Sequence, residues 1–296
     1  MPLSSQGAGA DEHRAPAEAL DRDDLPFQHY SLRHRAVAWI SRRLFDRVTY
    51  TVRHGLIRGM RRKGGLGWLP AGAATKEELF WRGLDLADFV IYDVGAFHGI
   101  LTLFFAPRCA RVVSYEPNES NHARLVENIA LNKLANVTVR KLGVGAQSGS
   151  ATLHYDPAMA GGGTLNPNAA AAVSQQVKIT SLDQDIAANG LPAPDLIKID
   201  IEGWELEALR GARDTLAACH PALFLEMHGE TMREKRGKAG EIVAFLVDAG
   251  YDNILHVESG AAITPSSSDP AAEGHLYCQY TASRSSDALP TPAAVH

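Results

Sequence analysis

The feature that most constrains the fold of this chain is a regular alternation of apolar and amphipathic segments, which begins at residue 89. The segments "FVIYDVG", "RVVSYEP" and "PDLIKIDIEG" are largely apolar until an acidic residue or a glycine ends them, as is typical of parallel strands buried on both faces. Segments with apolar residues at helical spacing, such as 118–132, lie between them. This alternation predicts an α/β fold with a doubly wound, mostly parallel sheet and helices on both of its faces.

The same patterns predict further elements along the chain. Strands are expected over residues 136–145, 150–155, 176–183, 221–229, 251–257 and 275–281. Helices are expected over residues 99–106, 206–216 and 242–249, the last of them ended by Gly250.

One α/β domain over residues 86–282 is expected to follow an N-terminal extension over residues 25–85. Residues 1–24 and 283–296 are rich in small and polar side chains, which predicts disordered tails. Three elements are expected within the extension: a helix over 32–48, a glycine-punctuated loop over 55–70 and a capped helix over 75–84.

Charge and cysteine content limit the classes of function. The formal net charge of −5 disfavours a general nucleic-acid binder. The three cysteines, Cys109, Cys219 and Cys278, form no C-x-x-C pair, which disfavours a disulfide framework or a structural zinc site. The sequence shows no secretory signal pattern and no apolar stretch of ~18 residues, so a cytoplasmic location is expected.

The turn "YDVGAFHG" at residues 92–99 occupies the place where open α/β sheets bind ligands, beyond the carboxyl ends of the strands. It does not fit the dinucleotide pattern G-x-G-x-x-G, because Phe97 and Ile100 stand where the second and third glycines would be. Acidic residues end most of the predicted strands, and they suit a cationic ligand that carries a ribose better than a pyrophosphate. These residues are Asp93, Glu116, Asp200, Glu202 and Glu226.

The motifs "YDVGAFHG", "SYEPNESNHARLVENIALN", "DLIKIDIEGWELEALRG" and "LFLEMHGE" resemble the FkbM family of S-adenosylmethionine-dependent methyltransferases, which have the class I fold. The resemblance covers about residues 45–255. It implies a seven-stranded sheet and methyl transfer, commonly to a hydroxyl of a sugar or a secondary metabolite. A nicotinamide-dependent oxidoreductase and a non-catalytic adaptor with the same fold are the alternatives, and calorimetry with each cofactor would separate the three.

The resemblance also implies which residues contact S-adenosylmethionine. Asp93, Gly95 and Gly99 would form the turn that holds its methionine and ribose, with Phe97 where the family often has asparagine or another small polar residue. Glu116 would accept hydrogen bonds from the ribose hydroxyls. Pro117, Asn118, Gly143 and Val144 would border the adenine, and Asp200 would lie beside both cofactor and acceptor.

A hydroxyl acceptor must lose its proton as it attacks the methyl group, and four residues near predicted strand ends could assist. These candidates are Asp200, Glu202, Glu226 and His228. One of them could take the proton directly, and for His228 a titration near the ordinary histidine pKa of ~6.5 is then expected. Alternatively, Asp200, Glu226 and His228 could hold a divalent ion that acidifies the hydroxyl. Glu205 and Glu207 are interpreted as a solvated helix face.

Residues 33–63 carry ten lysines or arginines and one acid, Asp46. Such a run is consistent with a solvated surface. It would also attract an anionic acceptor, such as a nucleotide-linked or lipid-linked sugar, or support peripheral contact with a membrane surface.

Overall fold

The computed structural model describes residues 46–64, 72–155, 173–228 and 232–281. Both predicted tails lie outside these residues, as does most of the helix expected over 32–48. The last three residues of that expected helix are described, and they form a turn that leads into a strand rather than a helical end.

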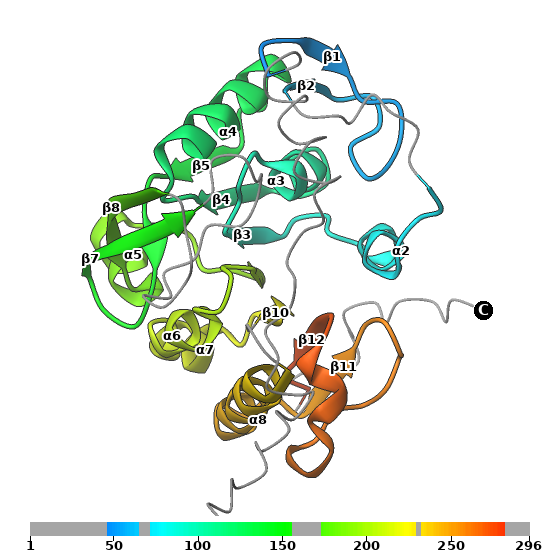
Figure 1. Cartoon of the computed structure of the whole chain (residues 1–296), viewed down its shortest axis with the longest axis vertical. Coiled ribbons are helices and arrows are strands. Elements are labelled where there is room, and N and C mark those ends of the chain that lie inside the picture. Colours follow the sequence, from blue (N-terminus) through cyan, green and yellow to red (C-terminus); the bar gives the residue numbers. More distant parts are fainter. Residues whose placement is uncertain (1–45, 65–71, 156–172, 229–231, 282–296) are drawn as a thin grey trace, which may run out of the picture.

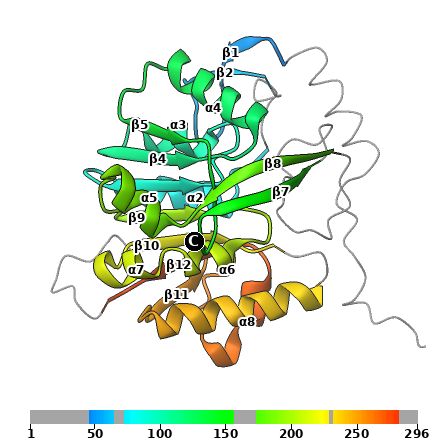
Figure 2. The ribbon, with the colours of Figure 1, turned by 90° about the vertical axis from the view of Figure 1, so that its left-hand side faces the viewer.

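A seven-stranded sheet forms the centre of the molecule, as predicted (Figures 1 and 2). Its order is β11-β12-β10-β9-β3-β4-β5, and every pair is parallel except the two that involve β12. The strands are β3 (Val90–Val94), β4 (Arg111–Tyr115), β5 (Val137–Arg140), β9 (Leu196–Ile199), β10 (Ala222–Glu226), β11 (Asn253–His256) and β12 (His275–Gln279). The order runs outward in both directions from β3 and β9, so the sheet has its switch point between these two strands.

Helices cover both faces of the sheet because alternate strand residues point to opposite sides. On one face, Trp81 of α2 and Phe105 of α3 pack with Ile91, Val112 and Phe224 of the strands. The helices on this side are α2 (Lys76–Gly83), α3 (Ile100–Phe105) and α4 (Glu119–Leu131). On the other face lie α5 (Leu182–Asn189), α6 (Glu205–Arg210), α7 (Arg213–Cys219) and α8 (Met232–Asp248).

A second, three-stranded sheet stands beside the main one. It consists of β6 (Gly143–Val144), β7 (Gly149–Tyr155) and β8 (Val173–Thr180). The β7–β8 hairpin projects from the body of the molecule (Figure 2). The single strand expected over 136–145 is therefore wrong, since β5 belongs to the main sheet and β6 to the small one.

Other differences from the predicted elements are local. The expected loop over 55–70 contains β2 (Arg61–Lys63), which pairs with β1 (Thr49–Thr51). Lys63 of this hairpin bonds Glu127, and Arg124 bonds Asp46, so the hairpin is anchored on α4. The single helix expected over 206–216 is divided into α6 and α7, and α5 was not predicted. Two short 3₁₀ helices, η2 (Pro265–Ser267) and η3 (Asp269–Ala272), were also missed.

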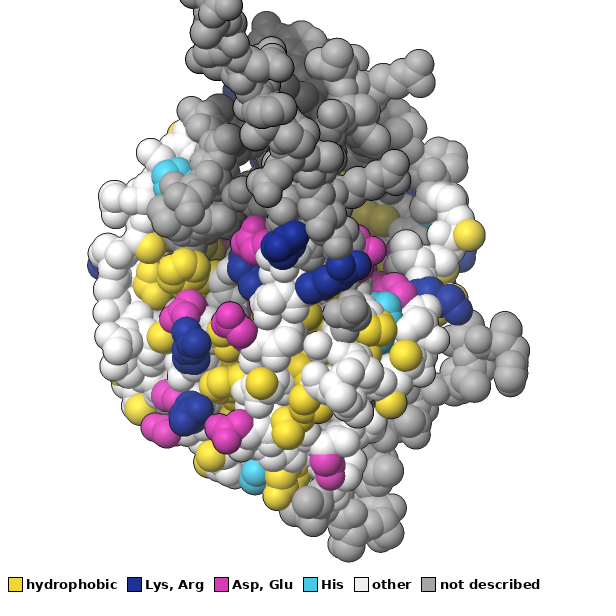
Figure 3. Space-filling model, turned by 60° about the horizontal axis from the view of Figure 1, so that its bottom comes forward, with side chains coloured by type: hydrophobic (Ala, Val, Ile, Leu, Met, Phe, Trp, Pro, Cys, Tyr) yellow, Lys and Arg dark blue, Asp and Glu magenta, His cyan; other side chains and the backbone are white. Residues whose placement is uncertain are grey.

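The predicted helix over 75–84 is confirmed as α2, with the Thr75 side chain accepting a hydrogen bond from the Glu78 amide. Within the described part of the chain, no helix is long and apolar enough to cross a bilayer. On the face that Figure 3 shows, acidic and basic side chains are intermingled, with hydrophobic side chains in small groups between them.

Candidate active site

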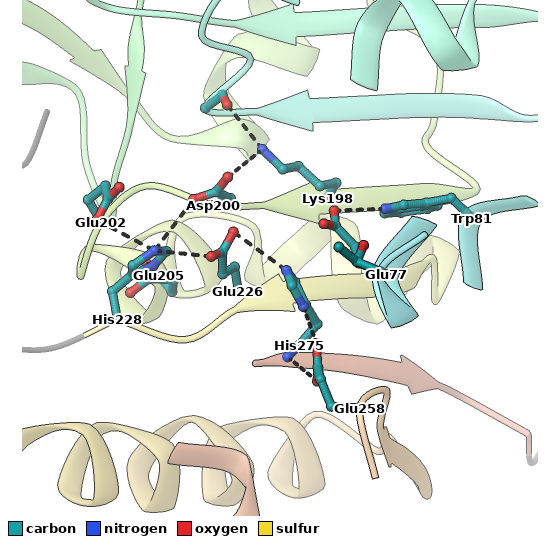
Figure 4. Close-up of polar contacts among 12 residues, drawn as sticks. Glu77, Trp81, Lys198, Asp200, Glu202, Glu205, Glu226, His228, Glu258 and His275 are labelled. Carbon is teal, nitrogen blue, oxygen red and sulfur yellow. Dashed lines mark hydrogen bonds and ion pairs between the residues drawn. The ribbon is translucent and has the colours of Figure 1, made fainter. Parts of the chain in front are cut away.

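A row of polar side chains lies on one face of the main sheet, at the edge where β3, β9 and β10 end (Figure 4). Strand alternation places Asp93, Lys198 and Glu226 on the side covered by α2. β12 runs in the opposite direction, so its first residue, His275, reaches the same edge. Asp93 lies opposite Lys198, and Glu226 lies opposite His275 in the strand register.

Lys198 is the buried cation at the centre of this row. Its Nζ lies 3.5 Å from Asp93 Oδ1 and 3.3 Å from Asp200 Oδ2. It also donates to the carbonyl oxygens of Val94, at 3.3 Å, and Gly95, at 3.0 Å. Burial alone would lower the pKa of Lys198, but the two carboxylates outweigh it and raise the pKa, so the ammonium stays charged. Sequence reasoning assigned no role to Lys198, although a lysine inside an apolar strand was a usable signal.

The turn after β3 is fixed by contacts with the sheet and with neighbouring side chains. Asp93 is fully buried and accepts a 2.6 Å hydrogen bond from Thr102, so its side chain supports the turn from the sheet side. Gly95 has φ +79°, and a Cβ there would lie 1.9 Å from the Asp200 carbonyl oxygen. Gly99 has φ +86°, and a Cβ there would lie 2.5 Å from Leu125. Both glycines are therefore required by backbone conformation and packing, whatever the turn binds.

Phe97, between the two glycines, adopts φ +52° and stacks on His98 with ring centroids 3.8 Å apart. Its amide donates a 2.8 Å hydrogen bond to Glu116 Oε2. Its contact with a cofactor, predicted from the resemblance, stays a prediction.

Glu116 joins this turn to the start of α4. Its Oε2 accepts from the Phe97 amide, and its Oε1 accepts a 2.9 Å bond from the Asn118 amide. The Asn121 side chain also bonds this carboxylate, which has about four lone-pair positions and so keeps capacity for a further donor. Burial raises the pKa of Glu116 to about 7, although the two backbone donors act in the opposite sense.

The residues predicted to border the adenine have structural roles as well. Asn118 is the N-cap of α4, and its side-chain oxygen accepts from the amides of Ser120 and Asn121. Gly143 lies beside Ile179 and Pro117, where a Cβ would be 2.6 Å from Ile179. Val144 is buried in the core beneath them. Pro117 and Gly143 lie next to each other, as they must if both border the adenine. Val144 is buried, and its contact with the adenine stays a prediction.

The four predicted catalytic residues form one cluster, in which three carboxylates surround the imidazole of His228 (Figure 4). Its Nε2 lies 3.5 Å from Glu202 Oε2, 3.6 Å from Glu226 Oε1 and 3.8 Å from Asp200 Oδ1. This arrangement follows from the pairing of β9 with β10. Because the two strands are parallel neighbours, the residues that follow their carboxyl ends lie side by side at the same edge of the sheet.

The opposite ring atom, His228 Nδ1, lies 2.9 Å from Glu205 Oε1. Glu205 also accepts a hydrogen bond from the Gly203 amide, and only 1% of its surface is exposed. The interpretation of Glu205 as part of a solvated helix face is therefore wrong. Its partner is a histidine 23 positions later, a pairing that no local pattern reveals.

The carboxylates set the protonation of this cluster. Burial would lower the pKa of His228, but the bond to Glu205 and the charges of Glu202, Glu205 and Asp200 raise it to about 9. The expected histidine titration near pH 6.5 is thus wrong for His228. Burial raises the pKa of Glu202 to about 7. For Glu226, burial would raise the pKa, but His275, His228 and Lys198 lower it to about 2.

Behind Glu226 lies a second group of residues that sequence reasoning missed. His275 Nε2 is 3.6 Å from Glu226 Oε2, and its Nδ1 is 2.5 Å from Glu258 Oε1. Glu77 of α2, which accepts a 3.1 Å bond from Trp81 Nε1, lies close by (Figure 4). The pKa of His275 is raised to about 9, because its bonds to Glu226 and Glu258 outweigh the effect of burial.

The chemistry of this edge fits S-adenosylmethionine better than a dinucleotide. Acceptor carboxylates lie close to the turn: Glu116, after β4, bonds the Phe97 amide, and Asp200 and Glu202 follow the neighbouring strand β9. Lys198 is the cation beneath the turn, and its ammonium already contacts two carboxylates and two carbonyls. A pyrophosphate would face this acidic edge, whereas a sulfonium with a ribose diol would find both charge and hydrogen-bond acceptors.

Comparison with known proteins shows which family the sequence matches. The family model described as the methyltransferase FkbM domain matches residues 93–252, which is more than half of the chain. The chain is 31% identical over 142 residues to the hexuronic acid methyltransferase AglP of Haloferax volcanii; the match covers 48% of this chain and 56% of that enzyme. The chain thus spans little more than half the length of this relative.

Two further proteins are similar. The methyltransferase sdnD of Sordaria araneosa is 28% identical over 194 residues, which cover 55% of this chain and 73% of that protein. Among solved structures, the methyltransferase FkbM of Methylobacillus flagellatus superposes with a TM-score of 0.43 at 22% identity, over 64% of this chain and 43% of that chain.

Proposed function

The chain belongs to the FkbM methyltransferase family, and we propose that it transfers a methyl group from S-adenosylmethionine to a hydroxyl of a sugar or of a secondary metabolite. The observation that carries the proposal is the position of Glu116. Its buried carboxylate lies at the end of β4, next to the turn after β3, and it keeps acceptor capacity for a ribose hydroxyl.

Most of the chain's contribution to the reaction would be positioning. S-adenosylmethionine supplies the methyl group when bound: its sulfur–methyl bond breaks as the oxygen–methyl bond forms, and S-adenosylhomocysteine is left. The turn that Lys198 and Asp93 hold in place would fix the cofactor relative to the acceptor oxygen. The hydroxyl proton would pass to a carboxylate of the edge, Asp200 or Glu202, and from there to solvent.

The acidic edge also bears on the acceptor. A hydroxyl compound would meet hydrogen-bond acceptors there, namely Asp200, Glu202 and Glu226. The relative AglP is named for the methylation of a hexuronic acid, and we extend a sugar acceptor to this chain as a proposal. A carboxylated sugar would need its acid directed away from these three carboxylates, whereas a neutral sugar would not.

A separate observation concerns anionic acceptors. A hollow of about 520 Å³ lies where α2 ends and α3 leads into β4, and arginines from three parts of the chain line it. They are Arg53, Arg58, Arg82 and Arg108, with Glu78 as the acid among the lining residues. This hollow lies towards the edge where β3 and β4 begin, away from the row at the carboxyl edge. We propose that this arginine-lined hollow attracts a phosphate group, either of a carrier-linked acceptor or of an anionic membrane. It would not contact the hydroxyl that is methylated.

Substitution of Glu116 tests the proposed function. Glu116→Ala should lose roughly 1.5–3 kcal/mol of binding free energy for S-adenosylmethionine, the scale of hydrogen bonds to a charged group. S-adenosylhomocysteine should weaken equally, because it has the same ribose. Glu119→Ala, in the exposed first turn of the same helix α4, is the matched control and should leave both affinities unchanged.

Calorimetry on the wild-type chain separates the remaining alternatives. Binding of NADH without S-adenosylmethionine would indicate an oxidoreductase, and binding of neither would indicate an adaptor. Transfer of an isotope-labelled methyl group into a metabolite extract, followed by mass spectrometry, would then identify the acceptor.

A further inference from the structure

We propose that Asp200, Glu226 and His228 form a binding site for a divalent metal ion at the carboxyl edge of the sheet. The ion's use in catalysis rests on the proposed function, because it would coordinate the acceptor hydroxyl; its binding does not. The three residues come from the ends of β9 and β10, and one ligand atom from each lies within 4.8 Å of the others.

The spacing of the atoms is close to that of ligands around one ion. Atoms bound about 2.1 Å from a metal lie about 3.0 Å apart at adjacent octahedral positions and about 3.4 Å apart in a tetrahedron. His228 Nε2 is 3.6 Å from Glu226 Oε1 and 3.8 Å from Asp200 Oδ1. These two distances exceed the ligand spacing around an ion by a few tenths of an ångström to less than one ångström, and all three atoms lie within 4.8 Å of one another, so side-chain adjustment would bring them around one ion.

A simple hydrogen bond does not describe these contacts. An imidazole N–H that donates to a carboxylate would bring one oxygen to about 2.7–3.2 Å from the nitrogen. Instead Nε2 faces three carboxylates at 3.5–3.8 Å, with none of them at hydrogen-bond distance. The third carboxylate is that of Glu202, which could complete the ligand set or accept the proton that the acceptor loses.

Contacts behind the ligands fix their orientation, as is usual at metal sites. Glu205 is buried and holds His228 through Nδ1, which leaves Nε2 directed at the carboxylates (Figure 4). His275 lies 3.6 Å from the second oxygen of Glu226 and is itself held by Glu258. Asp200 is held in the same way, with its second oxygen 3.3 Å from Lys198 Nζ, so each of the three ligands has a charged partner besides the other ligands.

The charge balance favours a dication. Four carboxylates surround the single imidazole: Asp200, Glu202, Glu205 and Glu226. Lys198 and His275 offset part of this charge, but the ammonium of Lys198 is divided between Asp200 and Asp93, and the imidazole of His275 is divided between Glu226 and Glu258. Mostly oxygen ligands with one imidazole suit ions such as Mg²⁺ or Mn²⁺. With three protein ligands such an ion keeps positions for a hydroxyl oxygen, whose pKa it would lower.

Direct measurement of Mn²⁺ binding tests the site without reference to turnover. The full chain is freed of metal with EDTA, dialysed and titrated with Mn²⁺, while electron paramagnetic resonance follows the free ion. We expect saturable binding of one ion per chain. Glu226→Gln and His228→Ala should weaken it by at least about tenfold, and Glu205→Gln, which alters only the positioning residue, by about 10-fold to 100-fold.

Glu241→Gln removes an exposed carboxylate of α8 and is the matched control, with Mn²⁺ affinity expected to be unchanged. Circular dichroism and a thermal melt of each variant distinguish lost ligands from lost folding. Absence of saturable binding in the wild type would overturn the proposal. So would wild-type affinity in folded Glu226→Gln and His228→Ala, or an equal loss in Glu241→Gln.

Calorimetry with S-adenosylmethionine in the presence of EDTA keeps the two proposals apart. Cofactor binding and methyl transfer without Mn²⁺ binding would overturn the metal site alone. Mn²⁺ binding without cofactor binding would overturn the proposed function and leave the metal site standing.

Discussion

Lys198 and Asp93 lie opposite each other on the adjacent parallel strands β9 and β3, with Nζ 3.5 Å from Oδ1 and both side chains buried. The same ammonium donates to the carbonyl of Gly95, the first residue of the turn after β3. A buried ion pair therefore connects the middle strands of the sheet to the turn on which cofactor binding is proposed to depend.

Lys198→Met should strongly destabilise the fold. The methionine fills a similar volume, but it leaves Asp93 buried without its cation, a change that typically costs about 3–5 kcal/mol. Urea denaturation measures the free energy of unfolding. Lys178→Met, in the exposed part of β8, is the control and should stay within about 0.5 kcal/mol of wild type. If the double variant Lys198→Met/Asp93→Asn is no more stable than Lys198→Met, the pairing with Asp93 is not the source of the loss.

Gly95→Ala should cost more stability than Gly190→Ala, although both glycines have a left-handed backbone. At Gly190, with φ +59°, a Cβ meets no atom within 4 Å, so its replacement adds backbone strain alone, about 1–2 kcal/mol. At Gly95 a Cβ would also meet the Asp200 carbonyl at 1.9 Å, so β3 and β9 must separate there. Thermal or urea unfolding of the pair checks this, and equal losses would contradict it.

Glu116→Gln should change how stability depends on pH. The folded pKa of about 7 lies above the ordinary value of ~4.3, so the folded state holds this proton more tightly than the unfolded one. The stability it contributes is present below pH ~4.3 and is lost as the pH rises through 7, by roughly 3 kcal/mol in total. The difference in unfolding free energy between wild type and variant should therefore fall by that amount between pH 4.5 and 8. Parallel pH curves would show that the carboxyl titrates alike in both states.

Asn118→Ala should destabilise the chain by about 0.5–2 kcal/mol, because it removes the N-cap of α4. Asn118→Ser retains a capping oxygen and should recover most of that loss. Cofactor affinity measured by calorimetry separates the cap from the predicted adenine contact. A weaker affinity in Asn118→Ser at unchanged stability would indicate that the asparagine side chain also reaches the ligand.

The main sheet was predictable from the sequence because hydrophobic periodicity is a local property. Each strand of the sheet overlaps an expected apolar segment, and β9 and β10 bring Asp200 and His228 together as adjacent strands must. The short strand β2 was missed because its sequence, "RRK", has no apolar pattern, and it exists only through pairing with β1.

What the sequence could not indicate depends on contacts between distant residues. Glu205 is buried and has His228 as its partner, and Lys198 stays charged in the core because Asp93 and Asp200 flank it. His275 reaches Glu226 only because β12 runs antiparallel beside β10. None of these pairings leaves a pattern in the local sequence of either partner. The residues that support the predicted site residues therefore could not be predicted from sequence patterns.

The position of β12 between β10 and β11 also sets a limit on the order of folding. β11 precedes β12 in the chain, yet β12 is its neighbour in the main sheet, so β11 cannot join the sheet until the later strand has paired with β10. His275 lies on that later strand, so we expect this edge of the sheet to be completed at a late stage, after a slow long-range closure. Pulse-labelled hydrogen exchange during refolding should find the amides of β11 protected no earlier than those of β12, and both later than the amides of β3 and β4.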